Sequence, residues 1–401
     1  MAQTAVLMTV TGRDHPGVTG ALFAVLGAHR VEVLDVEQVV VRGQLTLGVL
    51  VATEGGGDRL KADVERAMAV VGTAVSVRLD VGVDDPKSGG THVLVVMGRP
   101  LQASAIALLA GRLGELGVNI ETIRRVADYP VTGLELTVTA VDEDPLRRAV
   151  VEIGASAGVD IAVQRAGIAR RSKRLIVFDV DSTLITGEVI EMLADHIGRR
   201  AEVEAITERA MRGELDFAQS LHERVAMLVG LDAGVLDEVG RSLELTPGAR
   251  TTIRTLKRLG YRCGIVSGGF TQVARHLVED LSLDFVAANT LEVQGGRLTG
   301  RVVGDVVDRQ GKARALARFA LEFGVPLSQT VAVGDGANDI DMLTAAGLGI
   351  AFNAKPIVAE FADTTLNQPF LDPVLFILGI TRAEVEAADA ADGTLRRVPL
   401  G

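Results

Sequence analysis

Leu175-Ile176-Val177-Phe178-Asp179-Val180-Asp181-Ser182-Thr183 is an apolar run that ends in two acids and two hydroxyl residues. Such a run is typical of a buried parallel strand, and open α/β sheets place their chemistry at the C-terminal edge of these strands. Asp179 and Asp181 are two residues apart, so in an extended chain both point to the same side. One can attack a phosphorus or carbon centre while the other handles a proton, and Ser182 and Thr183 offer groups for an anion. The alternative is a strand that ends in an Asx-type turn.

Three later segments favour the chemical interpretation. Val266-Ser267-Gly268-Gly269 ends a second apolar strand, residues 261–266. Lys312 lies in Gly311-Lys312-Ala313, at the start of a helical pattern. A third apolar strand ends in Val331-Ala332-Val333-Gly334-Asp335-Gly336-Ala337-Asn338-Asp339. One such segment alone is a weak signal, whereas four in this order are a strong one.

The four segments are similar to the motifs of the haloacid dehalogenase superfamily of phosphatases, which begin with D-x-D-x-[TV] and end with G-D-G-x-N-D. The resemblance spans about half of the chain. It implies a Rossmann-like α/β core and an aspartyl nucleophile. Singly, each residue also has a structural interpretation: Lys312 as a surface lysine, and Asp335 and Asp339 as turn and cap residues.

The resemblance implies a role for each matching residue. Asp179 would be the nucleophile, and Asp181 would give a proton to the leaving alcohol and later take one from water. Asp179 and Asp335 would supply carboxylate oxygens to Mg²⁺, and Asp181 its backbone carbonyl; such hard oxygen ligands suit this cation. Asp339 would lie behind the metal and orient water or Lys312. The phosphoryl oxygens would be bound by Lys312, Ser267, the N–H of Gly268, and Asn338.

A helix-rich insert from about residue 188 to residue 245 predicts a small cap over the sheet edge, and Pro247-Gly248 marks the return to the core. Residues 179–188 together with residues 211–224 closely resemble phosphoserine phosphatases. By that resemblance Glu188 receives the substrate ammonium group and Arg224 its carboxylate, while Met211 and Phe217 form an apolar wall. Glu188 as a helix N-terminal acid and Arg224 on a solvated helix face are the alternatives.

Composition limits the partners and the compartment. The formal net charge is -11, and without a dense basic patch we expect no nucleic-acid partner. No apolar run reaches the ~20 residues needed to span a bilayer, and the N-terminus lacks a basic segment, so no membrane association is expected. The single cysteine, Cys263, alternates with Ile265 and Ser267, which indicates a core residue and suits a reducing cytoplasm.

The N-terminal half shows one pattern twice. Residues 5–10, 18–29, 32–41, 45–53, 58–71 and 74–79 predict a βαββαβ order, the ferredoxin-like split arrangement. Residues 84–90 predict a polar linker. The order then repeats through residue 163, with strands predicted at 92–97, 119–128, 133–141 and 160–163. An internal repeat of about 85 residues accounts for this half.

The first copy carries the turn Gly12-Arg13-Asp14-His15-Pro16-Gly17, which resembles the G-x-D-x-P-G turn of ACT domains, modules that bind amino acids between paired copies. Asp14 can accept an ammonium group or cap the helix, and Gly17 permits close backbone approach. The second copy has Gly98-Arg99-Pro100 and no acid there, although Leu116-Gly117-Val118-Asn119-Ile120 resembles the turn that lines ACT ligand sites. The candidate regulatory residues are Asp14, Gly17, Gly98 and Asn119.

These patterns predict a domain order. Residues 1–83 and 91–168 would be two ACT-type domains, residues 169–390 the phosphatase domain with its cap at about 188–245, and residues 391–401 a C-terminal tail. The basic joint, residues 169–174, is interpreted as a solvated linker.

The resemblances together imply a Mg²⁺-dependent phosphatase that hydrolyses O-phospho-L-serine to L-serine and phosphate, the last step of L-serine biosynthesis. An amino-acid effector, L-serine first among candidates, and a homodimer or higher homo-oligomer formed through the ACT-type domains are implied as well. Two alternatives stay open: a phosphotransferase of the same superfamily, and an amino-acid sensor with a vestigial phosphatase domain. The intact Asp179, Asp181, Lys312 and Asp335 argue against the sensor.

Overall fold

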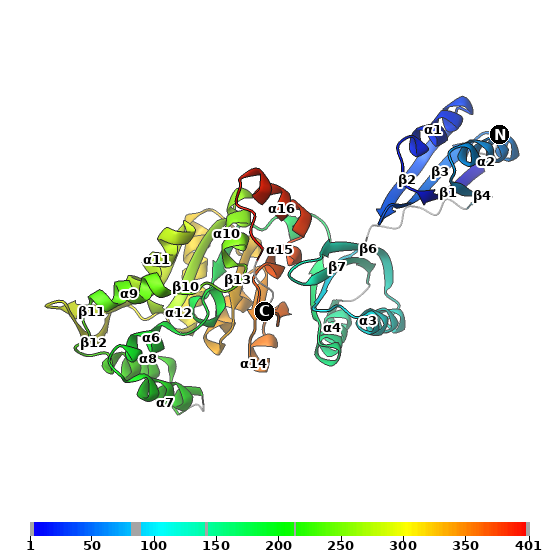
Figure 1. Cartoon of the computed structure of the whole chain (residues 1–401). Coiled ribbons are helices and arrows are strands. Elements are labelled where there is room, and N and C mark those ends of the chain that lie inside the picture. The colour runs from blue at the N-terminus through cyan, green and yellow to red at the C-terminus, as the bar shows by residue number, and fades with distance from the viewer. Residues whose placement is uncertain (1–3, 82–89, 141–142, 212–213, 398–401) are drawn as a thin grey trace. The chain divides into compact units, whose positions relative to one another are not determined.

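The computed structural model describes residues 4–81, 90–140, 143–211 and 214–397. Its chain runs from blue to red in Figure 1, and internal contacts divide it into two compact units with a boundary between Gly89 and Gly90. The predicted linker lies outside the described residues except for Gly90. Among the described residues, no helix is both long and apolar enough to cross a membrane.

The N-terminal unit has the predicted βαββαβ order. Its elements are β1 (Thr4–Arg13), α1 (Val18–Ala28), β2 (Glu32–Val41), β3 (Gln44–Thr53), α2 (Gly57–Val70) and β4 (Ala74–Leu79). The strands form one antiparallel sheet in the order β2-β3-β1-β4. Because strand side chains alternate between faces, Val6, Met8 and Val10 of β1 are buried with the apolar faces of both helices. The edge strand β2 is exposed along its whole length.

The second repeat has the same order and the equivalent sheet, β6-β7-β5-β8. Its elements are β5 (His92–Gly98), α3 (Ala103–Glu115), β6 (Asn119–Ala127), β7 (Thr132–Thr139), α4 (Glu143–Ala157) and β8 (Asp160–Arg165). Strand β5 is buried on both faces: Leu94 and Val96 belong to the core of the repeat, whereas Val93 and Val95 join the core of the large sheet that follows. The second repeat therefore packs onto the C-terminal part of the chain.

The large sheet has seven strands in the order β12-β11-β10-β9-β13-β14-β15, and all but β12 are parallel. The strands are β9 (Leu175–Phe178), β10 (Arg262–Phe270), β11 (Phe285–Gln294), β12 (Arg297–Val303), β13 (Thr330–Gly334), β14 (Gly349–Phe352) and β15 (Thr364–Leu366). Phe178 of the central strand lies beside Ile265 and Val333. The chain segments that follow these strands therefore meet at one edge, as predicted. The β11–β12 hairpin was not predicted.

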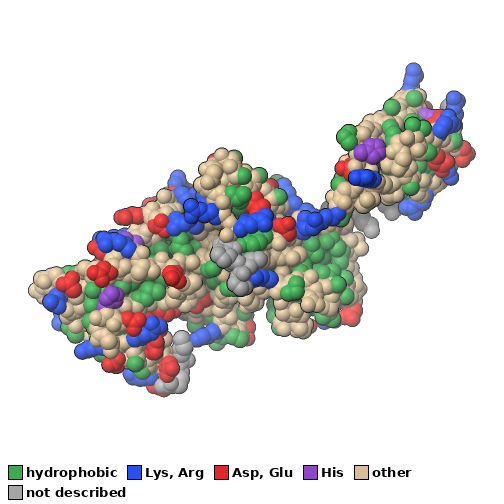
Figure 2. Space-filling view, in the orientation of Figure 1, with side chains coloured by type: hydrophobic (Ala, Val, Ile, Leu, Met, Phe, Trp, Pro, Cys, Tyr) green, Lys and Arg blue, Asp and Glu red, His purple; other side chains and the backbone are tan. Residues whose placement is uncertain are grey.

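Helices surround this sheet, and four of them form the insert. The insert contains α6 (Val189–Asp195), α7 (Arg200–Met211), α8 (Phe217–Ala226) and α9 (Gly234–Ser242). The others are α5 (Ile168–Arg171), α10 (Ala249–Arg258), α11 (Thr271–Leu281), α12 (Arg309–Glu322), α13 (Ile340–Ala345), α14 (Pro356–Ala359), α15 (Pro373–Ile377) and α16 (Arg382–Ala391). In Figure 1, α6, α7 and α8 are grouped together, in green. Acidic and basic side chains alternate over the visible face (Figure 2).

The interpretation of residues 169–174 as a solvated linker is wrong for Arg170 and Lys173, although Ala169, Arg171 and Arg174 are exposed. Arg170 is buried and its Nη1 lies 2.8 Å from Oε2 of Glu135 in the second repeat. Lys173 is also buried, and its Nζ donates to the carbonyl oxygens of Ser328, at 2.7 Å, and Gly347, at 2.6 Å. A run of charges predicts exposure only when nothing nearby can pair with it, and the partners here are distant in sequence. Cys263, by contrast, is a core residue as predicted, and burial raises the pKa of its thiol to about 12.

Candidate active site

Asp179 lies directly after β9, where the strand direction presents it at the sheet edge. It is 3% exposed, its backbone N–H donates to the carbonyl of Val333, and its Oδ1 accepts from the N–H of Val180 at 2.8 Å. Burial, followed by the charge of Asp339, raises the pKa of this carboxyl well above its ordinary value. A carboxylate in this place therefore needs nearby positive charge to remain ionised.

Lys312 provides one such charge. Asp308 caps α12 by accepting from the N–H of Gly311, which places Lys312 in the first turn of that helix. Lys312 is completely buried, and its Nζ lies 2.8 Å from Oδ1 of Asp179 and 2.7 Å from Oδ1 of Asp339. Burial opposes the charged form, but the two carboxylates together raise the pKa of the ammonium group above its ordinary value. The alternative of a surface lysine is wrong.

A second group of acids lies on the loop after β13. Asp335 accepts from the hydroxyl of Thr183 at 3.2 Å, and Asp339 accepts from the N–H of Gly336 at 3.0 Å. Carboxylate oxygens of Asp179, Asp335 and Asp339 lie within 4.8 Å of one another. Burial and the charge of Asp339 raise the pKa of Asp335 to about 7.

These residues fit a divalent cation. Three carboxylates at this spacing repel one another, and Lys312 alone does not balance them. Their oxygens are the hard ligands that Mg²⁺ prefers, and a cation among them would relieve the repulsion that raises the pKa values. The prediction counted Asp179, Asp335 and the backbone carbonyl of Asp181 as ligands; the structure adds the carboxylate of Asp339 as a near neighbour.

Asp181 has different surroundings from Asp179. The turn formed by Val180–Leu184 holds Ser182 in the left-handed region at φ 56° and ψ 3°. The carboxylate of Asp181 accepts from the N–H of Val189 at 2.8 Å, at the start of α6. Burial and the nearby charge of Glu188 raise the pKa of Asp181 to about 7, so the group can hold or release a proton near neutrality. It has no ion pair with Lys312, which distinguishes it from Asp179.

The last part of β10 approaches these carboxylates closely because two of its residues, Gly268 and Gly269, lack side chains. A Cβ on Gly269 would lie 3.2 Å from Oδ2 of Asp181, and one on Gly268 would lie 3.0 Å from Cζ of Phe217. Ser267 accepts from the N–H of Gly269 at 2.8 Å. Glycine at positions 268 and 269 therefore leaves room for a ligand between the last part of β10 and the acids.

Asn289 on β11 supports this part of β10, and sequence reasoning missed it. It is buried, its Nδ2 donates to the carbonyl of Gly268 at 2.8 Å, and its Oδ1 accepts from the N–H of Val307 at 2.8 Å. It thus ties the last part of β10 to the chain that leads into α12. A single Asn in a polar stretch gives no signal of such a role, because the pairing that brings β11 beside β10 was not predicted.

A cavity of about 700 Å³ lies between the sheet edge and the cap. Its lining includes these predicted residues: Asp179, Asp181, Glu188, Phe217, Arg224, Gly268, Asp335 and Asn338. Ser267 is not among the lining residues, and the side chain of Met211 lies outside the described part of the chain. Arg309 and Lys355 also line the cavity and were not predicted.

Two charged cap residues belong to this cavity. Glu188 accepts from the hydroxyl of Ser182 at 3.1 Å, and burial raises its pKa. Arg224 lies on α8, whose start is set by a capping box between Asp216 and Gln219. Its Nε donates to the carbonyl of Ser220 at 3.3 Å, and no acid among the described residues forms an ion pair with it. A half-buried guanidinium without an ion-pair partner, with its pKa lowered by burial, suits an anionic ligand group.

The candidate regulatory residues lie apart from this cavity in the chain. Gly17 adopts φ 103° as the residue that precedes α1, and no side chain caps that helix, so the interpretation of Asp14 as a helix cap is wrong. Gly98 ends β5, where a Cβ would lie 3.2 Å from Leu101 Cα and from Val159 Cγ1. Asn119 begins β6 and is exposed.

Family models match three parts of the chain. The model of haloacid dehalogenase-like hydrolases matches residues 176–344, and two ACT domain models match residues 4–81 and 90–164. The first match includes strands β9 to β13 of the large sheet and the cap but ends before β14 and β15, and the other two matches cover the two repeats.

Curated relatives match over nearly the whole chain. A phosphoserine phosphatase of Mycobacterium tuberculosis is 58% identical over 100% of this chain and 99% of its own length. One of Streptomyces coelicolor is 56% identical over 96% of this chain and 94% of its own length. Among solved structures, a probable phosphoserine phosphatase from Vibrio cholerae is similar with a TM-score of 0.58 and 35% identity, over 76% of this chain and 90% of that one.

Proposed function

The chain belongs to the phosphoserine phosphatases, enzymes of the haloacid dehalogenase type that here carry two ACT domains, and from this premise we propose that it works through an aspartyl-phosphate on Asp179. The observation that supports this most is the buried Lys312 between Asp179 and Asp339. It lies at the same sheet edge as Asp181 and beneath the cavity that Glu188 and Arg224 line.

In the first step a carboxylate oxygen of Asp179 attacks the phosphorus atom of O-phospho-L-serine, and the bond from phosphorus to the serine oxygen breaks. Lys312 stabilises charge on Asp179 and on the phosphoryl oxygens. Asp181 donates its proton to the departing serine oxygen, which a carboxyl with a pKa of about 7 can do. Because Asp181 is not paired with Lys312, the two acids can hold different protonation states.

In the second step water hydrolyses the aspartyl-phosphate. Asp181, now ionised, takes a proton from the attacking water, and the bond between phosphorus and the Asp179 oxygen breaks to release phosphate. The cap limits bulk water in the cavity, so the water that reacts is the one within reach of Asp181. Ser267, the N–H of Gly268 and Asn338 bind phosphoryl oxygens in both steps.

A divalent cation takes part in this chemistry, and we propose Mg²⁺. Asp179 and Asp335 would hold it with carboxylate oxygens and Asp181 with its backbone carbonyl, while Asp339 orients Lys312 at 2.7 Å. When bound, the cation neutralises charge on the phosphoryl group so that an anionic nucleophile can approach. Chelation should abolish turnover and Mg²⁺ should restore it; full activity after exhaustive metal removal would contradict this site.

The cap determines the substrate. We assign Glu188 to the ammonium group of phosphoserine, Arg224 to its carboxylate, and Phe217 and Met211 to the apolar wall. The charges of the two cap residues are complementary to those of a zwitterion, and both line the cavity beside Asp179. This reaction would form L-serine in the last step of its biosynthesis.

The function is tested by measuring phosphate release from a panel of phosphomonoesters. We expect phosphoserine to be the preferred substrate and Asp179→Asn to remove turnover while circular dichroism stays unchanged. An amide can serve neither as the anionic nucleophile nor as an equal metal ligand. Added acceptor alcohols should yield no new phosphoester; a new ester would indicate a phosphotransferase.

The two ACT domains are proposed to bind an amino acid, L-serine first among candidates, and to join subunits into a homodimer or larger oligomer. We retain the domain limits of residues 1–83, 91–168, 169–390 and 391–401 as part of this proposal. The exposed apolar side chains of the edge strand β2 support the assembly. An unpaired strand edge with exposed valines is a surface that another chain can cover.

A further inference from the structure

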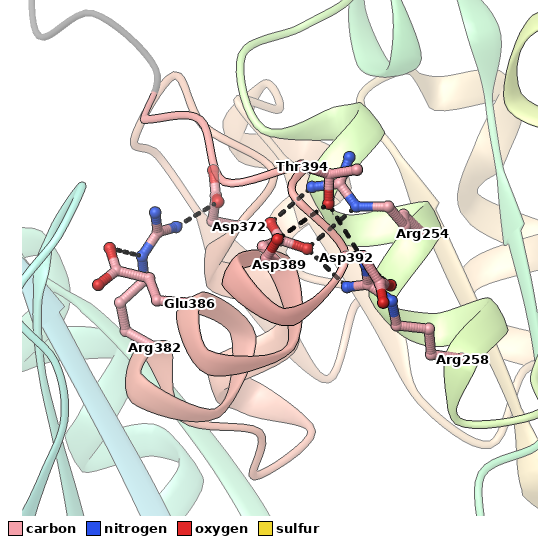
Figure 3. A network of polar contacts seen from close by, with 8 residues as sticks. All are labelled: Arg254, Arg258, Asp372, Arg382, Glu386, Asp389, Asp392 and Thr394. Carbon is pink, nitrogen blue, oxygen red and sulfur yellow. Dashed lines mark hydrogen bonds and ion pairs between the residues drawn. The ribbon is translucent and has the colours of Figure 1, made fainter.

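The C-terminal helix α16 is fixed to α10 by a network of charges (Figure 3). Asp389 is almost fully buried and accepts from Nη2 of Arg254 and Nη1 of Arg258, both at 2.6 Å. Asp392 accepts from Nη2 of Arg258 at 2.6 Å. Helix α10 begins at Ala249, directly after the residues where the cap returns to the core. Helix α16 thus holds the helix that follows the cap.

Arg382, the first residue of α16, contacts residues outside α10. Arg382 Nη1 lies 3.0 Å from Oδ1 of Asp372, and both side chains are buried (Figure 3). The guanidinium carbon of Arg382 also lies 5.0 Å from the ring centre of Tyr129, between β6 and β7 of the second ACT domain. A buried ion pair is not by itself strongly stabilising, because desolvation offsets the attraction. The ion pair here instead fixes the position of Asp372 relative to α16.

Asp372 contacts residues 246–248, the segment that joins the cap to α10 and that we call the hinge. A Cβ on Gly248 would lie 1.9 Å from Oδ2 of Asp372, so only glycine lets the two approach. The N–H of Leu371 donates to the carbonyl of Pro247 at 2.8 Å. The loop that carries Asp372 therefore lies directly against residues 247–248.

The other side of this hinge is bonded to the catalytic turn. The hydroxyl of Thr246 donates to the carbonyl of Thr183 at 2.7 Å, and its N–H donates to the carbonyl of Leu184 at 2.9 Å. Thr183 in turn donates to Asp335. A shift of residues 246–248 would therefore also displace the turn that carries Asp181.

We propose that Arg382 and Asp372 are positioning residues that hold residues 246–248 against the catalytic turn, and that Tyr129 of the second ACT domain fixes Arg382 for this task. The second ACT domain then influences how the cap closes through α16, without contact with the substrate. The contacts form one contiguous path, and coupling along it is what the experiment must demonstrate.

Arg397 provides a matched control. It also lies over the ring of Tyr129, at 5.2 Å, and it also pairs with Glu386, at 2.9 Å. Arg382 pairs with the same Glu386 at 3.0 Å but additionally with Asp372. Arg397→Ala therefore controls for the loss of the contacts with Tyr129 and Glu386, at a side chain that is 58% exposed where that of Arg382 is 5% exposed.

The experiment measures kcat and KM for phosphoserine and amide hydrogen exchange in the full chain. For Arg382→Ala we expect kcat/KM to fall between about two- and thirtyfold. We also expect faster exchange at two amides beside residues 246–248: that of Thr186, which donates to the carbonyl of Glu244, and that of Thr246, which donates to the carbonyl of Leu184. Arg397→Ala should leave both near wild type. Should Arg382→Ala fail to fold, Arg382→Lys and Tyr129→Leu are judged by the same two measurements.

Unchanged exchange at Thr186 and Thr246 in a folded Arg382 variant would overturn the inference, and so would equal effects of Arg382→Ala and Arg397→Ala. The effects of Arg382→Ala and Tyr129→Leu should be less than additive if both act through one path; full additivity would refute the role of Tyr129. The kinetic measurement rests on the proposed function, but hydrogen exchange does not, so the two can fail separately.

Discussion

Lys312 is an ammonium group without solvent contact, and its surroundings decide which charges the site tolerates. It bonds to Asp179 and Asp339, while Asp335 lies close to both acids. As the proposed nucleophile, Asp179 must be ionised, yet burial raises its pKa. Lys312, and a cation when one is bound, would each remove part of the repulsion among the acids and so favour the ionised form of Asp179.

Replacing Lys312→Met should abolish activity and lower the free energy of unfolding by about 3–5 kcal/mol, because it leaves two buried carboxylates without their partner. Urea unfolding and phosphate release measure these effects. Lys257→Met is the control, since Lys257 pairs with Asp284 at 3.1 Å but is partly exposed, and such pairs contribute at most about 1 kcal/mol. Equal losses of stability and activity in the two variants would show that Lys312 contributes no more than a partly exposed ion pair does.

Residues with one dominant chemical use could be predicted from the sequence, and residues with many uses could not. Asp179, Asp181, Lys312 and Asp335 stand out because acids and a lysine directly follow apolar strands or begin a helix. Asn289 could not be predicted, because its contact with Gly268 depends on the pairing of β11 with β10.

At the scale of elements, the role that we propose for the cap is to make the catalytic edge of the sheet selective for its substrate. Helices α6 and α8 bring Glu188 and Arg224 to the cavity, one at the start of α6 and one near the end of α8. Their positions depend on amphipathic packing, which the sequence pattern predicts, and on the end of each helix, which capping residues such as Asp216 determine.

Arg224→Ala should reduce kcat/KM for phosphoserine about ten- to a hundredfold, from the loss of a charged hydrogen bond of about 1.5–3 kcal/mol. Phosphoethanolamine has the same ammonium group but no carboxylate, so its use should change little. The ratio of the two specificity constants is the measurement. A uniform decrease on both substrates would mean that Arg224 supports the fold of the cap.

A buried acid, Asp160, links β8, at the edge of the second repeat's sheet, to the chain after β15, at the edge of the large sheet. The contribution of this contact to stability should depend on pH. Asp160 is 1% exposed and accepts from the N–H of Asn367 at 3.0 Å and from its Nδ2 at 2.8 Å. Burial raises the pKa of Asp160 from 3.8 to about 6. The folded state thus binds this proton more tightly than the unfolded state does, so the stabilising contribution is greatest below pH 4 and is lost as the pH rises through 6.

The size of this effect is roughly 3 kcal/mol for a shift of about two pH units. The test is urea unfolding of the wild type and of Asp160→Asn, which cannot titrate. Between pH 4 and 7, the free energy of unfolding of the wild type should fall relative to that of the variant. Parallel curves over this range would mean that Asp160 is ionised in the folded state at low pH.

At the scale of the whole molecule, the sequence predicted the order of the parts better than their contacts. The βαββαβ repeat and the core strands β9, β10 and β13 follow from strand and helix periodicity, which are local, whereas the other four strands of the large sheet were not predicted. The packing of the second repeat onto the large sheet was not predicted, although β5 carries apolar residues for both faces. The hairpin β11–β12 was missed because polar residues interrupt its first strand.

The N-terminal unit offers the last prediction: L-serine should bind at the Asp14–Gly17 turn when two copies of the chain pair. Asp14 is exposed and, with no side chain capping α1, can accept an ammonium group, while the N–H groups at the start of α1 can receive a carboxylate. A pocket that is complete only between subunits links binding to assembly, so serine should shift both the oligomer distribution and the activity. Sedimentation velocity with and without L-serine measures the first effect.

Product inhibition in the catalytic cavity is the competing explanation, and two variants separate it. Asp14→Ala should weaken the serine-dependent change in sedimentation, whereas Arg224→Ala should leave it intact because its contact belongs to the cavity. Asp58→Ala, an exposed acid at the start of α2, serves as the control for lost charge in the same unit. If Asp14→Ala responds to serine as the wild type does while Arg224→Ala does not, serine acts in the catalytic cavity and the ACT turn is not its binding site.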